Sequence, residues 1–324
     1  MSILDTKLDG VRTVLLLGHV RPDGDCVGSC LGLWNYLNEV YPQLEVTLCL
    51  EEPSGKFGYL KGFDAVQTVF VQEGDFDLCI CLDCSSTDRL GEGLASFALA
   101  KDSLCIDHHV TNTSYAKTNI VEPKASSTSE VLYGLLDERR ISKEIAECLY
   151  TGIIHDTGVF KYSCTSAKTM QIAGKLMETG IDFTNIIDGS FYRKTYIQNQ
   201  ILGRALLESI TFLHGACIFS VVRLKDMKFY GVTSKDLDGI IDQLRVTEGV
   251  QCAIFVYETE AQRYKVSLRS NTELDVAKIA EYFGGGGHVR AAGCTMSGSI
   301  YDVINNLSGH IEKQILELES RKES

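Results

Sequence analysis

The first half of the sequence alternates short apolar runs with longer amphipathic segments. The apolar runs are Thr13–Gly18, Glu45–Leu50, Ala65–Val71, Asp77–Leu82 and Ser103–Ile106. Apolar residues recur every three or four positions, as in helices, in Val27–Val40, Leu90–Ala100, Ser129–Arg139, Lys143–Ile154 and Ala167–Thr179. Strands that are apolar on both faces are covered by helices on both sides, so this alternation predicts an α/β domain with a doubly wound, mainly parallel sheet.

The second half has a different pattern. A more polar stretch near residues 185–210, with a helix predicted over Tyr196–Leu207, is typical of a connector between domains. The predicted strands beyond it are Ala216–Leu224, Gln251–Tyr257 and Tyr264–Arg269, and the predicted helices are Ser234–Arg245, Asp275–Tyr282 and Ile300–Leu318. We therefore expect a second, smaller α+β domain.

Charge limits the classes of partner. The chain has 324 residues and a formal net charge of −12, which is the wrong sign for a protein that follows a long nucleic-acid backbone. Any nucleic-acid substrate is therefore expected to be short, and long duplexes are excluded. The sequence has no apolar run long enough to span a membrane and its N-terminus lacks a signal-peptide pattern, so we expect a cytoplasmic protein without a membrane partner.

The twelve cysteines are scattered along the chain, and several lie inside apolar runs. We interpret most of them as reduced, buried side chains and not as a disulfide framework. Cys81 and Cys84 have the spacing of a redox or zinc pair, but a second pair at zinc-finger spacing is missing from the sequence. A structural role for these two thiols is the preferred interpretation.

Acidic and imidazole side chains follow several of the predicted strands. His19, Asp23 and Asp25 come directly after the first strand, Asp83 follows Leu82, and Asp107–His109 follows Ile106. The carboxyl ends of parallel strands meet at one edge of a sheet, where ligands bind. Keeping several desolvated carboxylates ionised at this edge costs free energy unless a cation offsets their charge.

A further aspartate, Asp156, ends an apolar helical segment that lies between Gly152 and Gly158. It completes a second plausible set of ligands. Asp23 and Asp25 also have a simpler interpretation, as turn formers and as the N-cap of the following helix. From the residues alone, both interpretations remain open.

The ligand types favour particular metals and a particular chemistry. Carboxylates and imidazoles without thiolates favour Mn²⁺ or Mg²⁺, with Fe²⁺ and Co²⁺ as alternatives, over structural zinc. Two such ions about 3.5–4 Å apart are standard machinery for phosphoester hydrolysis. The sequence contains neither a G-x-S-x-G elbow nor a Walker loop, which disfavours serine hydrolases and ordinary kinases or NTPases.

These motifs resemble the DHH family of phosphoesterases. The resemblance is carried by the order and spacing of His19-x-x-x-Asp23-x-Asp25, Asp83, Asp107-His108-His109 and Asp156. The run Gly284–His288, followed by Ala291-Ala292-Gly293, is similar to the DHH-associated C-terminal domain. The resemblance implies a catalytic DHH domain over residues 1–190, a helical connector over 191–210 and a substrate-binding domain over 211–324.

The resemblance also implies two bound divalent cations, with Mn²⁺ as the preferred metal. The implied ligands of one ion are His19, Asp23 and Asp83, and those of the other are Asp25, Asp83, His108 and Asp156.

Three residues have implied catalytic roles. Asp83 would bridge the two ions, His109 would face the scissile phosphate, and Asp107 would orient its neighbours. His155, beside a proposed ligand, is interpreted as a packing residue or as one that contacts a ligand, and not as a ligand itself.

The second domain supplies candidates for substrate binding. The run that includes Gly285, Gly286, Gly287 and His288 is either a flexible loop or a turn whose backbone N–H groups approach an anion, especially if a helix begins directly after it. We prefer the anion-binding interpretation. By the resemblance, Arg269 and Ser270 would contact the end of the substrate away from the reacting phosphate, with Arg269 paired to a phosphate.

The expected function is hydrolysis of short oligonucleotides (nanoRNA) to nucleoside 5′-monophosphates, with 3′-phosphoadenosine 5′-phosphate (pAp) as a further substrate that would yield AMP. Within the family, the nanoRNase and pAp phosphatase subgroup is the most similar. The alternatives are a phosphodiesterase for cyclic or linear dinucleotides (c-di-AMP or pApA), and a nucleotide sensor without turnover. A RecJ-like exonuclease is disfavoured by the acidic charge, and a homodimer is compatible with the sequence.

Overall fold

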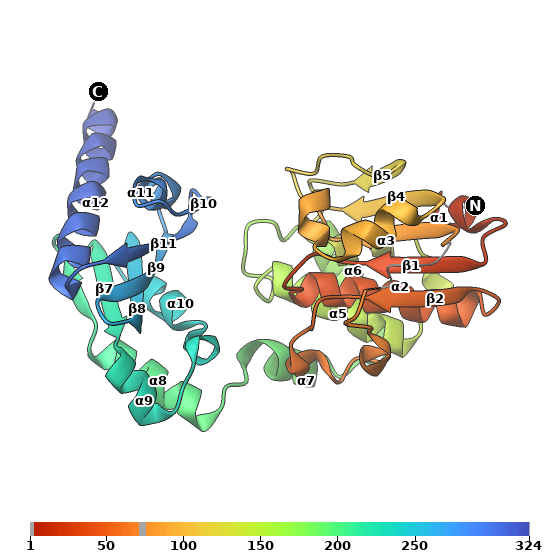
Figure 1. Ribbon diagram of the computed structural model, residues 1–324, viewed down its shortest axis with the longest axis horizontal. Helices are drawn as coiled ribbons and strands as arrows, with labels where there is room; N and C mark the ends of the chain where they lie inside the picture. The colour runs from red at the N-terminus through yellow and green to blue at the C-terminus, as the bar shows by residue number, and fades with distance from the viewer. Residues whose placement is uncertain (1–2, 71–75, 324) are drawn as a thin grey trace. The chain divides into compact units, whose positions relative to one another are not determined.

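The computed structural model describes residues 3–70 and 76–323 of the chain. The chain divides into two compact units, residues 1–193 and 194–324, and each has its own sheet and its own hydrophobic core (Figure 1). The units are described separately below.

The sheet of the first unit is parallel throughout. Its strand order is β2-β1-β3-β4-β5, with bounds Glu45–Cys49 for β2, Thr13–Leu17 for β1, Leu78–Leu82 for β3, Asp102–Asp107 for β4 and Thr118–Val121 for β5. Each neighbouring pair runs in the same direction. The expected α/β class with a doubly wound parallel sheet is therefore confirmed.

The strand predicted at residues 65–71 is wrong where the structure describes it. Phe63–Ala65 forms a 3₁₀ turn, and Gln67 makes only an isolated parallel bridge with Cys49. The last predicted residue, Val71, lies outside the described residues. An apolar run alone does not distinguish a strand from a segment that packs beside the edge of a sheet.

Side chains of β1 point alternately to two cores. Val14 and Leu16 pack in the core that contains α2 (Gly24–Val40) and α5 (Lys143–Asp156). Leu15 and Leu17 pack in the smaller cluster on the other face, which α3 (Gly93–Leu99) helps to cover. Helices on both faces explain why these strands are apolar throughout.

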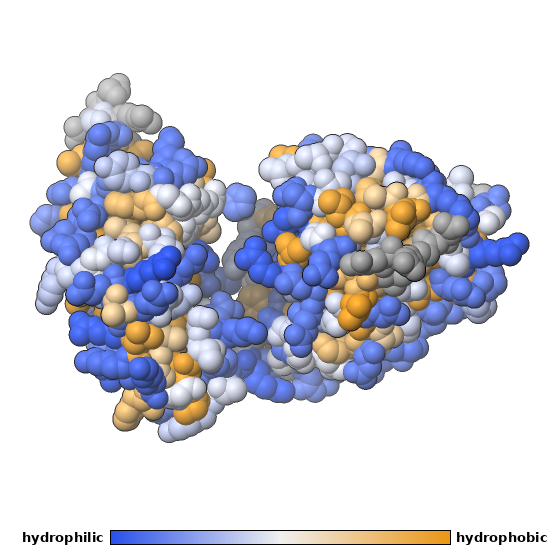
Figure 2. All heavy atoms as spheres, viewed as in Figure 1, coloured by the Kyte–Doolittle hydropathy of each residue, from blue (hydrophilic) through white to orange (hydrophobic). Residues whose placement is uncertain are grey.

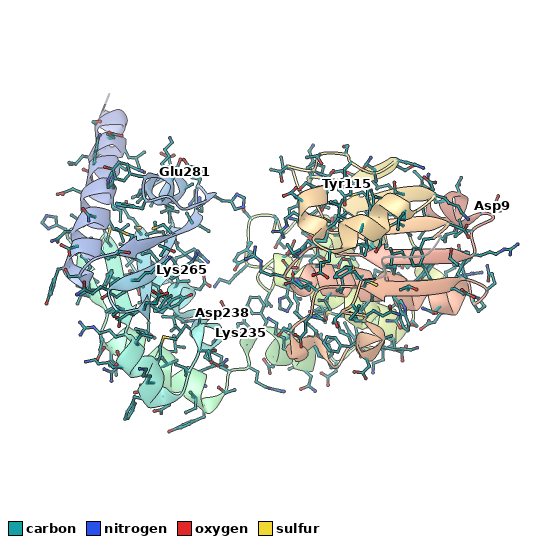
Figure 3. The ribbon with its side chains drawn as sticks, in the orientation of Figure 1. Asp9, Tyr115, Lys235, Asp238, Lys265 and Glu281 are labelled. Atoms are coloured by element: carbon teal, nitrogen blue, oxygen red, sulfur yellow. The ribbon has the colours of Figure 1, made fainter. Side chains whose placement is uncertain are left out.

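The smaller cluster contains an aromatic contact that fixes α3 over the sheet. Phe97 of α3 meets Tyr115 edge-on, with 5.5 Å between the ring centroids. Tyr115 lies in the segment between β4 and β5 and is labelled in Figure 3. The core on this face is therefore built partly from a loop.

The remaining helices of the first unit are α1 (Ile3–Leu8), α4 (Thr128–Tyr133), α6 (Ala167–Glu178) and α7 (Phe183–Ile187). Two predicted helices are shorter than expected. The segment 90–100 contains a turn at Gly91, whose φ is +55°, before α3 begins. The segment 129–139 leaves the helix at Gly134.

The second unit has a mixed sheet in the order β10-β11-β9-β8-β7-β6. The strands are β6 (Ile210–Phe212), β7 (Cys217–Val222), β8 (Cys252–Glu260), β9 (Arg263–Ser270), β10 (Gly286–His288) and β11 (Ala291–Ser297). Only β7 and β8 pair in parallel among these neighbours. This mixed sheet with packed helices agrees with the expected α+β class.

Helices cover both faces of this second sheet. Side chains of α11 (Val276–Tyr282) and α12 (Ile300–Glu323) pack in one core cluster, and those of α8 (Tyr196–Leu207) and α10 (Ile240–Arg245) pack in another. A further helix, α9, spans Leu224–Tyr230.

On the face shown in Figure 2, hydrophobic residues of both units lie among hydrophilic ones. In the part of the chain that the structure describes, no helix combines the length and the apolar character that crossing a bilayer requires.

Candidate metal centre

The loop after β1 places His19 at the carboxyl edge of the parallel sheet. His19 is buried, and its Nδ1 lies 2.8 Å from the carbonyl oxygen of Val20. Its Nε2 lies 3.5 Å from Oδ2 of Asp83 and 3.7 Å from Oδ2 of Asp23. The backbone contact on one ring nitrogen orients the other nitrogen toward the carboxylates.

Asp23 is the N-cap of α2, which is one of the two roles that the sequence left open, and its side chain also faces the cluster. Its Oδ1 accepts hydrogen bonds from the backbone N–H groups of Asp25 and Cys26, each at 3.1 Å, and so caps α2. Its Oδ2 faces His19. One oxygen therefore stabilises the helix while the other remains directed at the cluster.

Asp25 is fully buried and is held by the first residues of α4. Its Oδ2 accepts from the backbone N–H of Thr128 at 2.6 Å, and its Oδ1 accepts from that of Ser129 at 3.0 Å. The sequence analysis missed both donors. The sequence signal that could have found them is the unbroken run of hydroxyl residues Ser126–Ser129, a composition typical of a helix N-terminus, where backbone N–H groups are free to donate.

Asp83 lies at the centre of the cluster. It leaves β3 with φ +55°, a strained conformation for a residue other than glycine, and it is buried. Its Oδ1 accepts from the Thr128 hydroxyl at 2.9 Å and lies 3.7 Å from His108 Nε2 and 3.6 Å from His109 Nδ1. Together with the His19 contact, three imidazoles surround this one carboxylate.

Asp107 ends β4 and organises the two histidines that follow. Its Oδ1 accepts from the backbone N–H of His108 at 2.8 Å and lies 2.7 Å from Nδ1 of His109. Its Oδ2 accepts from Nδ2 of Asn112 at 2.6 Å. Asn112 is a second residue that the sequence analysis missed, because nothing in its local sequence indicates that it bonds back to the strand end.

Asp156 reaches the cluster from the last turn of α5. Its Oδ2 lies 3.0 Å from Nε2 of His108. The helix approaches closely because of Gly152, where an added Cβ would lie 2.0 Å from the Ser129 hydroxyl and 2.5 Å from Asp25 Oδ1. The missing side chain at Gly152 therefore lets α5 bring Asp156 close to Asp25 and Ser129.

His155, although adjacent to Asp156, lies elsewhere. Its Nε2 lies 3.1 Å from the hydroxyl of Ser190, and its ring meets Phe57 and Phe191 edge-on. Burial, together with the charge of Lys56, lowers its pKa to about 4. This environment favours a neutral packing histidine, as the sequence analysis expected.

Two carboxylates of the cluster are harder to ionise than usual, chiefly because they are buried and also because other carboxylates lie near. Burial, together with the charges of Asp83 and Asp156, raises the pKa of Asp25 well above its usual value. Burial and the Asp83 charge also raise the pKa of Asp156 to about 6, against the opposing effect of His108. Both carboxylates are costly to keep ionised in these positions without a positive charge nearby.

The imidazoles respond in the opposite direction. Burial lowers the pKa of His19, but its contacts with Asp23 and Asp83 outweigh burial and raise the pKa to about 12. His108 follows the same pattern, because Asp156, Asp25 and Asp83 raise its pKa to about 10. A divalent cation among these groups would supply the positive charge that the protons supply here.

The donor atoms fit a divalent metal. Within the described residues, three groups place all their ligand atoms within 4.8 Å of one another: His19, Cys26 and Asp83; Asp83, His108 and His109; and Asp25, His108 and Asp156. Carboxylate oxygens and imidazole nitrogens suit Mn²⁺ or Mg²⁺ better than a thiolate-selective metal. The acidic and imidazole groups are therefore positioned to bind divalent metal.

Cys26 belongs to one of these groups, but the predicted pair of Cys81 and Cys84 does not take part in this arrangement. Cys81 and Cys84 are free and buried, and neither belongs to a metal-capable group among the described residues. Burial raises the pKa of both thiols, which disfavours the reactive thiolate.

In the second unit, Arg269 and Ser270 end β9. Arg269 is half-buried, with Nη1 donating to the carbonyl oxygen of Leu268 at 3.1 Å and Nε 3.8 Å from Asp242. Ser270 is buried, and its hydroxyl donates to the carbonyl oxygen of Thr272 at 3.1 Å. Arg269 therefore keeps further donors for an anion, while Ser270 closes a local turn.

The arrangement that would favour anion binding, a helix that begins directly after the glycine run, is not found, because β10 and β11 come next. The run follows a helix: Gly284 and Gly285 donate their backbone N–H groups to Glu281 and Ala280 and so cap α11. Gly286 and Gly287 then belong to β10, which pairs with β11. The end of a helix that lies here carries a negative partial charge, so it does not attract an anion.

What the run presents instead is an exposed hairpin. His288 ends β10 and is exposed, and Gly287 has φ +147°, which a side chain rarely permits. An added Cβ at Gly287 would lie 2.5 Å from the carbonyl oxygen of Ala291. These glycines allow two strands to approach closely.

Two family models match the chain, each over one unit. Residues 13–153 match the DHH family N-terminal domain, and residues 216–317 match the DHHA1 domain. Two bacterial relatives match most of the sequence. The probable bifunctional oligoribonuclease and PAP phosphatase NrnA of Streptococcus mutans is 27% identical over 93% of this chain and 96% of its own length. The bifunctional oligoribonuclease and PAP phosphatase NrnA of Thermus thermophilus is 27% identical over 88% of this chain and 84% of its own length.

A solved structure shares the fold. The crystal structure of an exopolyphosphatase-related protein from Bacteroides fragilis superposes with a TM-score of 0.89, at 24% identity, over 98% of this chain and 96% of that one.

Proposed function

Because the chain belongs to the DHH family, with a DHH domain followed by a DHHA1 domain, we propose that it is a divalent-metal-dependent phosphoesterase of the cytoplasm. Its proposed substrates are short oligonucleotides, which it cleaves to nucleoside 5′-monophosphates, and pAp, which it converts to AMP. The observation that carries this proposal is the convergence of His19, Asp83 and Asp156, which come from the loop after β1, the end of β3 and the last turn of α5.

Two cations, with Mn²⁺ preferred, are proposed to bind here. One would be held by His19, Asp23 and Asp83, and the other by Asp25, Asp83, His108 and Asp156. When bound, such ions supply a coordinated water of lowered pKa and positive charge beside the phosphoryl oxygens. The contacts of Thr128 with Asp25 and Asp83 keep both carboxylates in place before any ion arrives.

His109 is the proposed proton carrier and phosphate contact. Its Nδ1–H donates to the Asp107 carboxylate, which leaves Nε2 directed away from that pair. The hydrogen bond to Asp107 raises the pKa of His109 above its usual value. A protonated Nε2 could hydrogen-bond a phosphoryl oxygen or protonate the departing oxygen.

The second unit is proposed to bind the remainder of the substrate. Arg269 would pair with a terminal phosphate, and the hairpin that contains Gly285, Gly286, Gly287 and His288 would lie against the nucleotide, with Ser270 supporting the strand end. The names of the curated relatives, which join oligoribonuclease and PAP phosphatase activities, support this class of substrate.

A substrate panel tests the proposal. The full chain is incubated with Mn²⁺ and, separately, with pApA, pAp, c-di-AMP or a 20-residue single strand, and the products are resolved by chromatography. We expect AMP from pApA and pAp, little product from the long strand, and no turnover in excess chelator. Hydrolysis of c-di-AMP alone would replace the proposal with a cyclic dinucleotide phosphodiesterase, and binding without turnover would replace it with a sensor.

A further inference from the structure

A hollow opens beside His19 on the first unit, at the carboxyl ends of β1 and β2. Its volume is about 420 Å³, within the range of small-molecule sites. His19 lines it, so the hollow lies beside the candidate metal centre, although none of the other proposed ligands belongs to its wall. The proposed function does not account for it.

The wall of the hollow has two chemical characters. Phe70, which is half-buried, and Leu90, which is buried, supply an apolar surface. Glu51, Glu52 and Glu92 supply carboxylates at its rim. An apolar surface with a few hydrogen-bonding groups is typical of a site for a ring-shaped organic ligand.

The hollow is held open by backbone constraints. The backbone N–H of Val20 donates to the carbonyl oxygen of Arg89 at 2.8 Å and joins the two sides of the wall. Gly91 has φ +55°, and an added Cβ there would lie 2.5 Å from Val20 Cγ1. The Arg21 N–H donates to Glu51 at 2.5 Å, so this carboxylate has a defined position.

The carboxylates decide which part of a substrate can enter. A second phosphate would be repelled by Glu51, Glu52 and Glu92, whereas ribose hydroxyls and the amino groups of a base can donate to them. Acidic side chains bind ribose hydroxyls in this way in dinucleotide-binding folds. Phe70 offers a face on which a base could stack.

We infer that this hollow binds the uncharged nucleoside attached to the scissile phosphate, on the side that carries no further phosphate. The inference rests on the proposed function and assigns it a subsite. In pApA this nucleoside is the terminal adenosine, which keeps the phosphate on its 5′ oxygen and leaves as AMP, because the 3′ oxygen of the other adenosine departs when water attacks the phosphodiester. In pAp no such nucleoside exists, so the hollow discriminates dinucleotides from pAp.

Two substrates that differ only in this nucleoside test the inference. One is pApA, and the other is the methyl phosphodiester in which a methyl group replaces the terminal adenosine of pApA. The variants are Glu51→Gln with Glu52→Gln, which removes two acceptor charges, and Thr68→Trp, which adds bulk at an exposed position of the wall. Glu45→Gln is the matched control, because Glu45 is an exposed residue at the opposite end of β2.

We expect kcat/KM for pApA to fall about ten-fold in the double variant, because neutral hydrogen bonds to the hydroxyls replace charge-assisted ones, and to fall further in Thr68→Trp. The value of kcat/KM for the methyl diester should fall much less. Glu45→Gln should have the same kcat/KM as the unsubstituted chain for both substrates. If kcat/KM falls by the same factor for both substrates, or falls for neither, the inference is wrong while the proposed function stands.

A binding measurement separates the two proposals if the unsubstituted chain cleaves neither substrate, which would overturn the proposed function. Adenosine, which carries no phosphate, is titrated into the metal-free chain by calorimetry. The inference requires that adenosine binds the unsubstituted chain and the Glu45→Gln variant more tightly than Thr68→Trp. Equal binding to all three, or no binding to any, would overturn it.

Discussion

The two units present their candidate functional residues in opposite ways. In the first unit, Asp25, Asp83 and Asp107 are buried, and each accepts hydrogen bonds from defined donors. In the second unit, His288 is exposed and Arg269 lies 3.8 Å from Asp242. The first set of groups is removed from water by folding, whereas the second set lies at the surface of its unit.

This difference predicts different kinetic roles. Groups that are already oriented and desolvated can stabilise charge that develops during the reaction, and their loss lowers kcat. Groups on a surface bind substrate and transition state about equally, and their loss raises KM. The following predictions test this division.

The largest effect is expected at the residue with the most contacts in the cluster. Asp83→Asn keeps the size of the side chain and its contact with Thr128 but removes the charge that faces His19, His108 and His109. We expect kcat with Mn²⁺ to fall by at least about 10³-fold with unchanged circular dichroism. Asp88→Asn, at an exposed position shortly after it, is the control. A variant with near-normal turnover would remove Asp83 from the centre of the site.

A smaller effect, with a pH signature, is expected at Asp107. Its hydrogen bond raises the pKa of His109, so Asp107→Asn should lower that pKa. If protonated His109 assists the departing group, the alkaline limb of the pH–rate profile moves to lower pH, and kcat near neutrality falls about 10²-fold.

Asp77→Asn is the control for this measurement. Asp77 lies before β3, at the opposite end of the strands, and bonds Lys101. Its replacement should leave the profile in place. An Asp107→Asn profile with an unchanged limb would show that His109 does not carry the titrating proton.

Substitutions in the second unit should change KM more than kcat. Arg269→Ala removes a cation from the end of β9, and we expect KM for pApA to rise about ten-fold or somewhat more while kcat changes little. Arg263→Ala, at the other end of the same strand, controls for charge. A fall in kcat with unchanged KM would contradict the division between the units.

The sequence predicted the parallel sheet and the convergence of its strand ends well, because both follow from local patterns. Apolar runs indicate strands buried on both faces, and the polar residues that follow them must meet at one edge. The sequence did not predict how the carboxylates are held. Thr128 contacts Asp25 from more than a hundred residues away, and no spacing rule connects two such positions.

The glycine run was predicted poorly for a different reason, because its local pattern is clear but fits several structures. Glycines tolerate a phosphate-binding turn, a helix C-cap and a close strand pair equally well. The choice among these depends on what packs next to the run, here α11 before it and β11 after it. The sequence shows that four consecutive residues lack side chains, but it does not show which backbone or side-chain atoms pack against them.

The last prediction affects stability, with the smallest expected effect on turnover. An added Cβ at Gly285 would lie 2.2 Å from the Gly293 carbonyl oxygen and 2.6 Å from the Cβ of Cys294, whereas at Gly286 it would meet nothing within 4 Å. Gly285→Ala should therefore lower the free energy of unfolding by about 2 kcal/mol, and Gly286→Ala should change it by less than about 0.5 kcal/mol.

Urea unfolding of the full chain measures both variants, with circular dichroism reporting both units. Trp34, the only tryptophan, lies in the first unit, so its fluorescence reports that unit. We expect the Gly285→Ala transition to move in circular dichroism more than in fluorescence, because the strained backbone belongs to the second unit. Equal urea midpoints for the two alanine variants would mean that the hairpin backbone moves to accommodate the added Cβ. The hairpin would then be an adaptable loop and not a fixed strand pair.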